Sequence, residues 1–228
     1  MFFLLAPCCL LLAPSSLYRL LIVHPAALEA RGLAKSYGGP PVFSGLSLHV
    51  ERGLVAVAGR NGSGKTTLLK LLAGLLRPDS GSVEVKRDGS LLSGESRRHA
   101  IGWAGPDLAF YEELTPRENL AFFRRAAGYR STSGDTDRRL NEVGLAPEAF
   151  EKPTGALSTG MRQRLRLAFA GLFDPPILLL DEPMVGLDAA GRELVAGLIA
   201  SHRRAGAVLL ASNDERDFVD PDQFVSLG

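Results

Sequence analysis

The sequence has little cysteine and almost no excess of charge. Its 228 residues contain two cysteines, Cys8 and Cys9, which are adjacent and lie near the start of the chain. A disulfide framework and a cysteine-ligated zinc site are therefore excluded for the rest of the chain. The formal net charge is +1, whereas proteins that bind polyanions through bulk charge carry a clear basic excess. We therefore expect no nucleic-acid partner.

An intrinsically disordered chain is also excluded, because hydrophobic residues make up 46% of the sequence and charged residues only 22%. The length of 228 residues fits one compact domain or two small lobes that share a fold. The sequence contains no internal repeat and no low-complexity linker. We expect one folded unit over residues 28–228, preceded by an apolar extension over residues 1–27.

The beginning of this extension differs from everything that follows. Residues 1–23 carry a single charge, Arg19, and as one helix they would be about 35 Å long, enough to cross a bilayer core of about 30 Å. Two prolines interrupt the run, and the positive region that opens a secretory signal is missing. Methionine is absent between Met1 and Met161, so a start assigned to Met1 can lie upstream of the true one. Three interpretations stay open: a start-site artefact, a membrane anchor, or a soluble extension or signal.

Short apolar runs alternate with helical patterns along most of the chain. The two segments beside the Gly-Gly-Pro-Pro turn at 38–41 should form antiparallel strands. Strands that alternate with helices predict an α/β fold with a mainly parallel core sheet. A polar helical stretch at 115–145 interrupts this alternation, and we expect a helical subdomain at about 106–160. The predicted strands are 28–36, 42–50, 54–58, 83–85, 101–104, 177–180, 207–211 and 224–227, and the other helices 65–76, 158–173 and 189–204.

The clearest motif is glycine-rich. Residues 59–66 read GRNGSGKT, which fits G-x-x-x-x-G-K-[ST] between a predicted strand and a predicted helix. The glycines let the backbone wrap a phosphate chain, toward which the amide groups and the helix N-terminus point. Lys65 is expected to bridge the β- and γ-phosphates, and Thr66 to bind Mg²⁺ through its hydroxyl. The expected nucleotide-binding residues of this loop are Gly59, Asn61, Gly62, Ser63, Gly64, Lys65, Thr66 and Thr67.

Two carboxylates follow the apolar run at 177–180. Asp181 stands where a carboxylate can hold a Mg²⁺ ion. Glu182 stands where it can polarise a water for in-line attack, and a general base contributes about 10²–10⁴-fold to a rate. Alone, these residues would be ordinary charges at the end of a strand. Together with the phosphate loop they predict hydrolysis of a nucleoside triphosphate.

A second helix start lies 23 residues before Asp181, counting from Ser158. Ser158 is a suitable N-cap, and a helix N-terminus with free amide donors can bind a phosphate. Since the chain already has one such site, the second would serve the nucleotide of a facing subunit. Three arginines follow at alternate positions, and we expect them to form a solvated or salt-bridged face: Arg162, Arg164 and Arg166.

The segments SYGG, GRNGSGKTT, LSTGMRQR, LLLDEP, VGLD and ASND, in this order, resemble the nucleotide-binding subunit of an ABC transporter. The resemblance covers residues 28–228. It implies a P-loop NTPase (RecA-like) core, an antiparallel β subdomain and an inserted α-helical subdomain. It also implies an ATPase that uses ATP and Mg²⁺, pairs with a second ATP-binding subunit around two ATP, and drives a transmembrane permease from the cytoplasmic face of the membrane as a peripheral subunit.

The resemblance implies roles for single residues as well. Tyr37 would stack on the adenine. Ser158 and Gly160 would contact the γ-phosphate across a head-to-tail dimer, and Asp188, after Leu187, would lie in the loop that links the two sites. The expected metal ligands are Thr66 and Asp181, and the expected catalytic residues are Lys65, Glu182 and Asn213.

This sequence departs from the family pattern in two binding segments. The signature is usually LSGGQ, and here Thr159 and Met161 replace glycine and glutamine, although the serine and the second glycine remain. The family usually has a glutamine shortly after the strand predicted at 101–104, where this chain has Pro106 and Asp107. Proline offers no side-chain donor or acceptor and cannot contact Mg²⁺ or water as glutamine does. Whether Asp107 substitutes for it is left open.

A third departure is Asn213, which stands where the family usually has histidine. An amide can donate a hydrogen bond to the γ-phosphate but cannot carry a positive charge. We expect hydrolysis that is slower than in a member with all parts, but not absent, because Glu182 remains.

The form of the signature and the segment 110–120 are similar to exporter-type subunits, most of all those of haem export and cytochrome c maturation. Subunits of general bacterial export systems are similar as well. Two alternatives stay open: a regulatory ATP-binding module with weak hydrolysis, and a soluble ABC ATPase that does not transport. The sequence does not identify the cargo or the permease.

Overall fold

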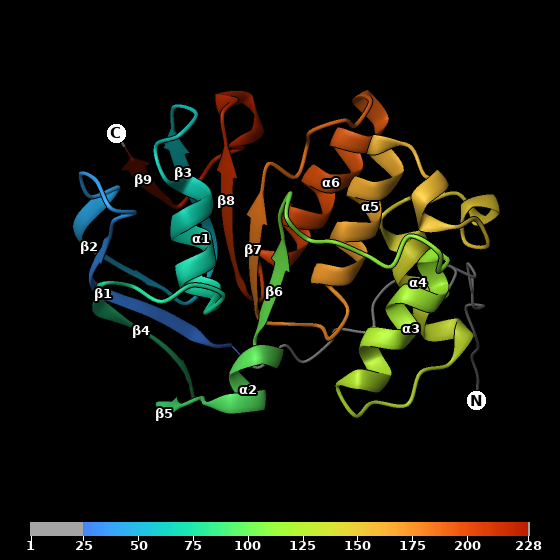
Figure 1. The fold of residues 1–228 in the computed structure, drawn as a ribbon, viewed down its shortest axis with the longest axis horizontal. Helices are drawn as coiled ribbons and strands as arrows, with labels where there is room; N and C mark the ends of the chain where they lie inside the picture. The colour runs from blue at the N-terminus through green and yellow to red at the C-terminus, as the bar shows by residue number, and fades with distance from the viewer. Residues whose placement is uncertain (1–24, 228) are drawn as a thin grey trace, which may run out of the picture.

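Two β-sheets organise residues 25–227, the part of the chain that this computed structural model describes (Figure 1). The interpretations of the apolar start concern residues 1–24 and lie outside the described residues. One sheet is parallel throughout, with the strand order β6 (Ile101–Ala104), β7 (Ile177–Asp181), β8 (Ala207–Ser212), β3 (Gly53–Gly59) and β9 (Gln223–Leu227). The other is antiparallel, with the order β2 (Phe43–Val50), β1 (Ala27–Lys35), β4 (Ser80–Arg87) and β5 (Ser90–Leu91).

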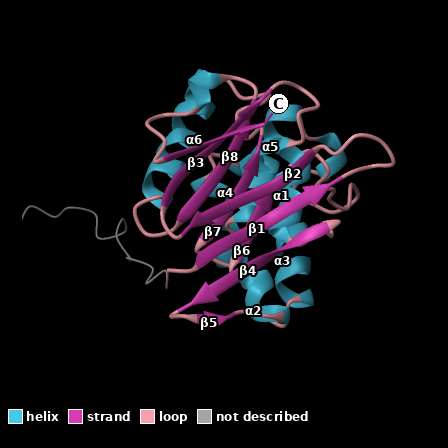
Figure 2. Cartoon of the chain, turned by 90° about the vertical axis from the view of Figure 1, so that its left-hand side faces the viewer, coloured by secondary structure: helices cyan, strands magenta, loops and turns pink. Residues whose placement is uncertain are grey.

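The helices complete the α/β fold that the alternating pattern predicts. Figure 2 shows the strands of the antiparallel sheet crossing in front of the parallel ones, with helices behind them. The predicted parallel core and the predicted pairing of the first two strands are both confirmed. The helices are α1 (Lys65–Ala73), α2 (Gly94–His99), α3 (Pro116–Ala126), α4 (Ser133–Glu142), α5 (Thr159–Ala170) and α6 (Ala189–His202), and short 3-10 turns lie at Pro147–Ala149, Thr154–Ala156 and Glu215–Asp217.

The parallel sheet is buried on both faces, which explains why its strands read as continuous apolar runs. Along β8, Val208 and Leu210 pack into one hydrophobic cluster, and Leu209 and Ala211 pack into the other. The first cluster contains α5 and α6 residues, whereas the second joins α1 to the antiparallel sheet through Leu68 and its neighbours. Helix α1 thus lies between the two sheets, and the loop that precedes it is held from both sides.

The stretch predicted as helical at 115–145 forms two helices. Thr115 and Glu118 make a reciprocal capping box at the start of α3, and Thr132 and Asp135 make another at the start of α4. The division into a helical subdomain at about 106–160 stays a prediction. Helix α2 was not predicted, because its sequence GESRRH has no buried side chain and therefore no apolar period. Among residues 25–227, every helix is too short or too polar to span a bilayer.

Candidate active site

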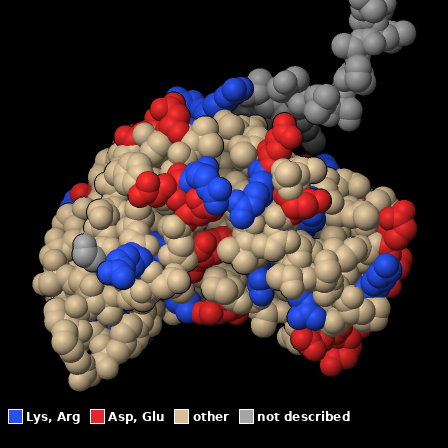
Figure 3. Space-filling model, turned by 90° about the horizontal axis from the view of Figure 1, so that it is seen from above, with Lys and Arg blue, Asp and Glu red and all other residues tan. Residues whose placement is uncertain are grey.

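The predicted site residues converge at one edge of the parallel sheet. The phosphate loop follows β3, Glu182 follows β7, and Asn213 follows β8. Because parallel strands end at the same edge, these three connections lie side by side. Figure 3 views the molecule from the end toward which the strands point in Figure 1, and acidic and basic side chains are interspersed across that face.

The phosphate loop requires glycine at two positions. Gly62 and Gly64 have φ values of 83° and 99°, in the left-handed region that side chains disfavour. A Cβ on Gly64 would also collide with the side chain of Val42, at the start of the segment leading into β2. Gly64 is the residue before α1, and its own conformation sets the start of that helix. The loop can therefore approach a phosphate chain closely through its backbone.

Lys65 is the best anchored side chain of the loop. It is 6% exposed, and its ammonium donates to the Gly59 carbonyl at 2.7 Å, the Arg60 carbonyl at 3.2 Å and Asn213 Oδ1 at 2.6 Å. An ammonium has three donors, so protein oxygens satisfy all of them. A phosphate that binds Lys65 must replace at least one of these acceptors.

Thr66 and Asp181 form the candidate metal site. The Thr66 hydroxyl donates to Asp181 Oδ2 at 2.6 Å, and Asp181 is only 3% exposed. Burial raises the pKa of Asp181, which the hydrogen bond from Thr66 and the charge of Lys65 oppose. A hydroxyl and a carboxylate are the hard oxygen ligands that Mg²⁺ binds, usually together with waters and phosphate oxygens. The donor set therefore fits Mg²⁺.

Glu182 is held in an unusual backbone conformation. Its φ is 51°, which costs a non-glycine residue about 1–3 kcal/mol and persists only where neighbours fix it. The Glu182 amide donates to the Ala211 carbonyl at 2.8 Å, and the Glu182 carbonyl accepts from Gln163 Nε2 at 3.3 Å. Within residues 25–227, its Oε1 atom is buried and has no hydrogen-bond partner. Burial raises the pKa of the Glu182 carboxyl, as suits a general base.

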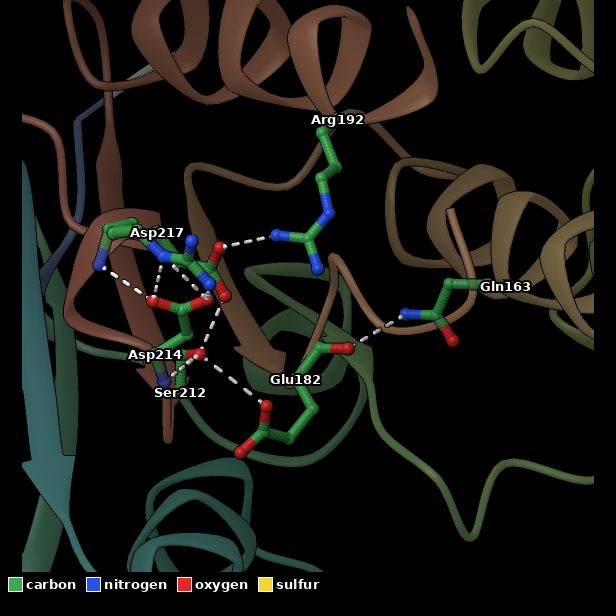
Figure 4. Close-up of polar contacts among 7 residues, drawn as sticks. Gln163, Glu182, Arg192, Ser212, Asp214 and Asp217 are labelled. Atoms are coloured by element: carbon green, nitrogen blue, oxygen red, sulfur yellow. Dashed lines mark hydrogen bonds and ion pairs between the residues drawn. The ribbon is translucent and has the colours of Figure 1, made fainter. Parts of the chain in front are cut away.

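Ser212 connects Glu182 to a second carboxylate (Figure 4). Its hydroxyl lies 2.6 Å from Asp217 Oδ2 and 3.4 Å from Glu182 Oε2, and it accepts from the Asp214 amide. Asp217 in turn accepts from Arg192 of α6 at 3.1 Å. The single hydroxyl proton therefore points mainly to Asp217, and within residues 25–227 Glu182 Oε1 keeps no hydrogen-bond partner. Sequence reasoning missed Ser212, Asp217 and Arg192, because only the turn after β8 brings them together.

The phosphate loop, Asp181, Glu182 and Asn213 surround a cavity of about 400 Å³. Pro106 and Val42 also line the cavity, whereas Gly59 and Ser63 of the phosphate loop do not. Tyr37 is 65% exposed at its rim, with its hydroxyl 3.5 Å from Thr67 Oγ1. The predicted site residues that line the cavity are Tyr37, Asn61, Gly62, Gly64, Lys65, Thr66, Thr67, Asp181, Glu182 and Asn213.

Besides Gly59 and Ser63, three predicted site residues do not line this cavity: Ser158, Gly160 and Asp188. Ser158 caps α5 by accepting from the Met161 amide at 3.2 Å, and Asp188 caps α6 by accepting from the Gly191 amide at 2.9 Å. A Cβ on Gly160 would lie 2.7 Å from the Gly186 carbonyl, so these two loops touch. Within one chain, the signature helix start and the phosphate loop thus belong to separate surfaces.

The side chain of Asp107 does not line the cavity that contains Asp181 and Glu182. It forms an ion pair with Lys70 of α1 and faces a larger cavity of about 910 Å³ beside β6 and α3. Of Pro106 and Asp107, it is Pro106 that lines the cavity beside Asp181 and Glu182. The residue that this loop contributes to the candidate site is thus a proline, which has no side-chain donor or acceptor.

The three arginines of α5 are half-buried rather than solvated. Arg164 lies 3.5 Å from Asp188, as a salt-bridged face predicts, and it also donates to the Val143 carbonyl. Arg162 donates to the Gly155 carbonyl at 2.6 Å, and Arg166 to the carbonyls of Pro106 and Leu108. The prediction is wrong for Arg162 and Arg166, because backbone oxygens of neighbouring loops bind them.

Comparisons with known proteins agree with this geometry. A family model described as "ABC transporter" matches residues 43–185. The daunorubicin resistance ATP-binding protein DrrA3 of Streptomyces coeruleorubidus is 38% identical over 85% of this chain, which spans 62% of that protein. The cytochrome c biogenesis ATP-binding export protein CcmA of Rhodopseudomonas palustris (strain HaA2) is 38% identical over 81% of this chain and 90% of its own length. The fold matches a dimeric ATP-binding cassette solved in a post-hydrolysis state with ADP and Pi, with a TM-score of 0.75 at 22% identity over 88% of this chain and 94% of that one.

Proposed function

We propose, from the premise that this chain belongs to the ABC transporter family of ATPases, that it is an exporter-type ATP-binding subunit. In this proposal it dimerises around two ATP and drives a transmembrane permease at the cytoplasmic face of the membrane, where it is peripheral. The observation that carries it is the convergence of Lys65, Asp181 and Glu182 on one cavity, with the signature helix start on another surface. The relatives named as a cytochrome c biogenesis export protein and a daunorubicin resistance protein support export.

The chemistry follows from the order of the groups in the cavity. The amides of residues 61–66 and Lys65 would bind the phosphate chain, and Tyr37 would stack on the adenine. Thr66 and Asp181 would hold Mg²⁺, which supplies charge neutralisation at the β- and γ-phosphates. Glu182 would accept a proton from the attacking water, and its buried free oxygen is available for this. Asn213 would donate to the γ-phosphate.

The dimer supplies what one chain lacks. Ser158 and Gly160 stand at the N-terminus of α5, outside the cavity of their own chain. In a head-to-tail pair, that helix start would face the γ-phosphate bound by the partner. Asp188 caps α6 next to the signature loop, so the loop that links the two sites would move with the signature helix.

The permease would dock at the cavity of about 910 Å³ between α1, β6 and α3. Its walls include the aromatic side chains of Trp103, Phe123, Phe169 and Phe173, and concave apolar surfaces of this kind commonly receive a partner. The segment 110–120, which resembles the permease-facing segment of exporters, continues from this surface because Phe110 packs edge-on against Phe123 and Phe169.

The test is steady-state ATP hydrolysis by the full chain against Glu182→Gln, together with molar mass by light scattering. We expect turnover to fall by about 10²–10⁴-fold in the variant, as for loss of a general base. Stalled by slow hydrolysis, Glu182→Gln should double its mass with Mg-ATP but not with Mg-ADP. Lys65→Ala, which should bind neither nucleotide, is the control. Unchanged turnover in Glu182→Gln would refute the catalytic assignment, and a monomeric mass with ATP would refute the dimer.

A further inference from the structure

Arg166 of α5 connects the loop after β6 to the interior of the site. Its guanidinium donates to the Pro106 carbonyl at 3.2 Å and the Leu108 carbonyl at 3.4 Å. A third donor of the same group reaches Gln163 Oε1 at 3.2 Å. Gln163 lies one helical turn earlier, at i−3, on the same face of α5. One side chain therefore holds two backbone atoms of the loop and the amide of Gln163 at once.

Gln163 continues this connection to Glu182. It is 5% exposed, and its Nε2 atom donates to the Glu182 carbonyl at 3.3 Å (Figure 4). The amide has only one workable orientation, since a flip would place its NH₂ group against Arg166 and its oxygen against a carbonyl. Arg166 thus decides which end of Gln163 faces Glu182.

The bond to Gln163 acts on a residue whose backbone needs support. Glu182 has a φ of 51°, and its amide is fixed by the Ala211 carbonyl. On the other side, its carbonyl accepts from Gln163 and, within the turn, from the Val185 amide at 3.3 Å. Left-handed conformations of non-glycine residues persist where such contacts over-determine them. Losing one contact should let the peptide relax and turn the Glu182 side chain.

The loop held by Arg166 borders both cavities. Pro106 lines the cavity that contains Glu182, and Leu108 lines the larger one beside α3. Their carbonyls are the two atoms that Arg166 holds. A displacement of residues 106–108 from either side would pull on Arg166 and, through Gln163, on the backbone of Glu182.

We propose that Arg166 and Gln163 are positioning residues that set the aim of Glu182 according to the position of the loop at residues 106–108. The proposal rests on the function proposed above for Glu182. It gives this chain a connection between loop and base that runs through backbone carbonyls, and that needs no side-chain ligand at Pro106.

The experiment compares ATP-hydrolysis kinetics of Arg166→Met, Gln163→Met, the double variant and the parent chain. Methionine keeps the unbranched stem of both side chains and removes their donors. We expect kcat to fall by about tenfold or more in each single variant, since a misplaced catalytic group costs up to about 100-fold. KM for ATP should change by less than about twofold, because neither residue lines the nucleotide cavity. The double variant should be no slower than the slower single one, because the two residues act in series.

Arg162→Met is the matched control, since Arg162 lies on the same helix and, within residues 25–227, donates only to the Gly155 carbonyl. Its kcat should stay within about twofold of the parent. The proposal is overturned if both single variants keep the parental kcat, if their losses multiply in the double variant, or if Arg162→Met loses as much kcat as they do. If Arg166→Met fails to fold, Arg166→Lys and Gln163→Met decide by the same criteria. Glu182→Gln is measured in parallel. Turnover that survives in Glu182→Gln refutes the proposed function. Turnover that is lost in Glu182→Gln but kept at the parental level in the Arg166 and Gln163 variants refutes only the positioning.

Discussion

The contact between Lys65 and Asn213 predicts that removing the asparagine side chain strengthens nucleotide binding but slows ATP turnover. Lys65 donates to Asn213 Oδ1 at 2.6 Å, its shortest hydrogen bond. A phosphate must compete with this acceptor, so the contact opposes nucleotide binding. Asn213→Ala removes the competitor, and we expect the variant to bind ADP more tightly. Its kcat for ATP should fall, because the proposed donor to the γ-phosphate is lost with the same side chain.

The magnitude follows from the kind of bond. A hydrogen bond to a charged group contributes about 1.5–3 kcal/mol, and water in the open cavity would replace part of it. Discounted to about 0.7–1.4 kcal/mol, the change corresponds to ADP binding about 3- to 10-fold tighter. The gain for ATP should be smaller than for ADP, because ATP alone carries the γ-phosphate that Asn213 would contact.

The assay is isothermal titration calorimetry with Mg-ADP on the parent chain, Asn213→Ala and Asn213→Asp. The aspartate variant is the matched control, because a charged acceptor holds the ammonium more strongly and should weaken ADP binding. The order of affinity is therefore Ala, parent, Asp. ADP affinity that is unchanged or lower in Asn213→Ala, with folding intact, would refute the competition between Asn213 and the phosphate.

Three further predictions concern the metal, the pH dependence and the core. Asp181→Asn should raise the Mg²⁺ concentration needed for half-maximal ATPase by about tenfold or more, whereas Asp107→Asn should change it by less than about threefold; a larger effect at Asp107 would contradict its pairing with Lys70. Burial lowers the pKa of His202, so the unfolded chain binds a proton at this residue before the folded chain does as pH falls below about 6.5. Stability to urea should therefore drop between about pH 7.5 and 5.5, and the drop should be smaller in His202→Gln. Equal losses of stability in the two chains would exclude His202 as the cause. Leu179→Ala, at a fully buried position of β7, should lower the free energy of unfolding by about 2–5 kcal/mol in urea denaturation, and a loss below about 1 kcal/mol would show that the core refills the space.

The parts of the fold that could be predicted are those with a local signal. The phosphate loop has a fixed motif, and the runs at 177–180 and 207–211 are apolar on both faces, so their strands were placed almost to the residue. Strand β4 was predicted only at 83–85, because its start at Ser80–Ser82 is polar and is defined by pairing with β1. Helix α2 has no buried face and gave no periodic signal.

The parts of the site that could not be predicted depend on distant pairings. Nothing near Asp107 in the sequence indicates Lys70, which lies 37 residues earlier. The face of α5 occupied by Gln163 and Arg166 follows from the packing of the loop at 106–108 against it. The local sequence around a glutamine in an arginine-rich helix is the same whether that glutamine is buried or solvated. Only the fold distinguishes the two.

The replacement of histidine by Asn213 acquires a physical meaning from these contacts. An asparagine amide has both an acceptor and donors, and in the structure the acceptor is used by Lys65. A phosphate that replaced Asn213 at Lys65 would release the asparagine side chain, which could then turn its donors toward the γ-phosphate. Nucleotide binding and a movement of the residues at the end of β8 would then be coupled, because Lys65 exchanges Asn213 for a phosphate oxygen. Because Ser212 precedes Asn213 and lies between Asp217 and Glu182, that exchange would also move the hydroxyl next to the proposed catalytic carboxylate. In the proposed mechanism, the uncharged residue would give up electrostatic stabilisation of the γ-phosphate but keep a direct link between nucleotide binding and the environment of Glu182.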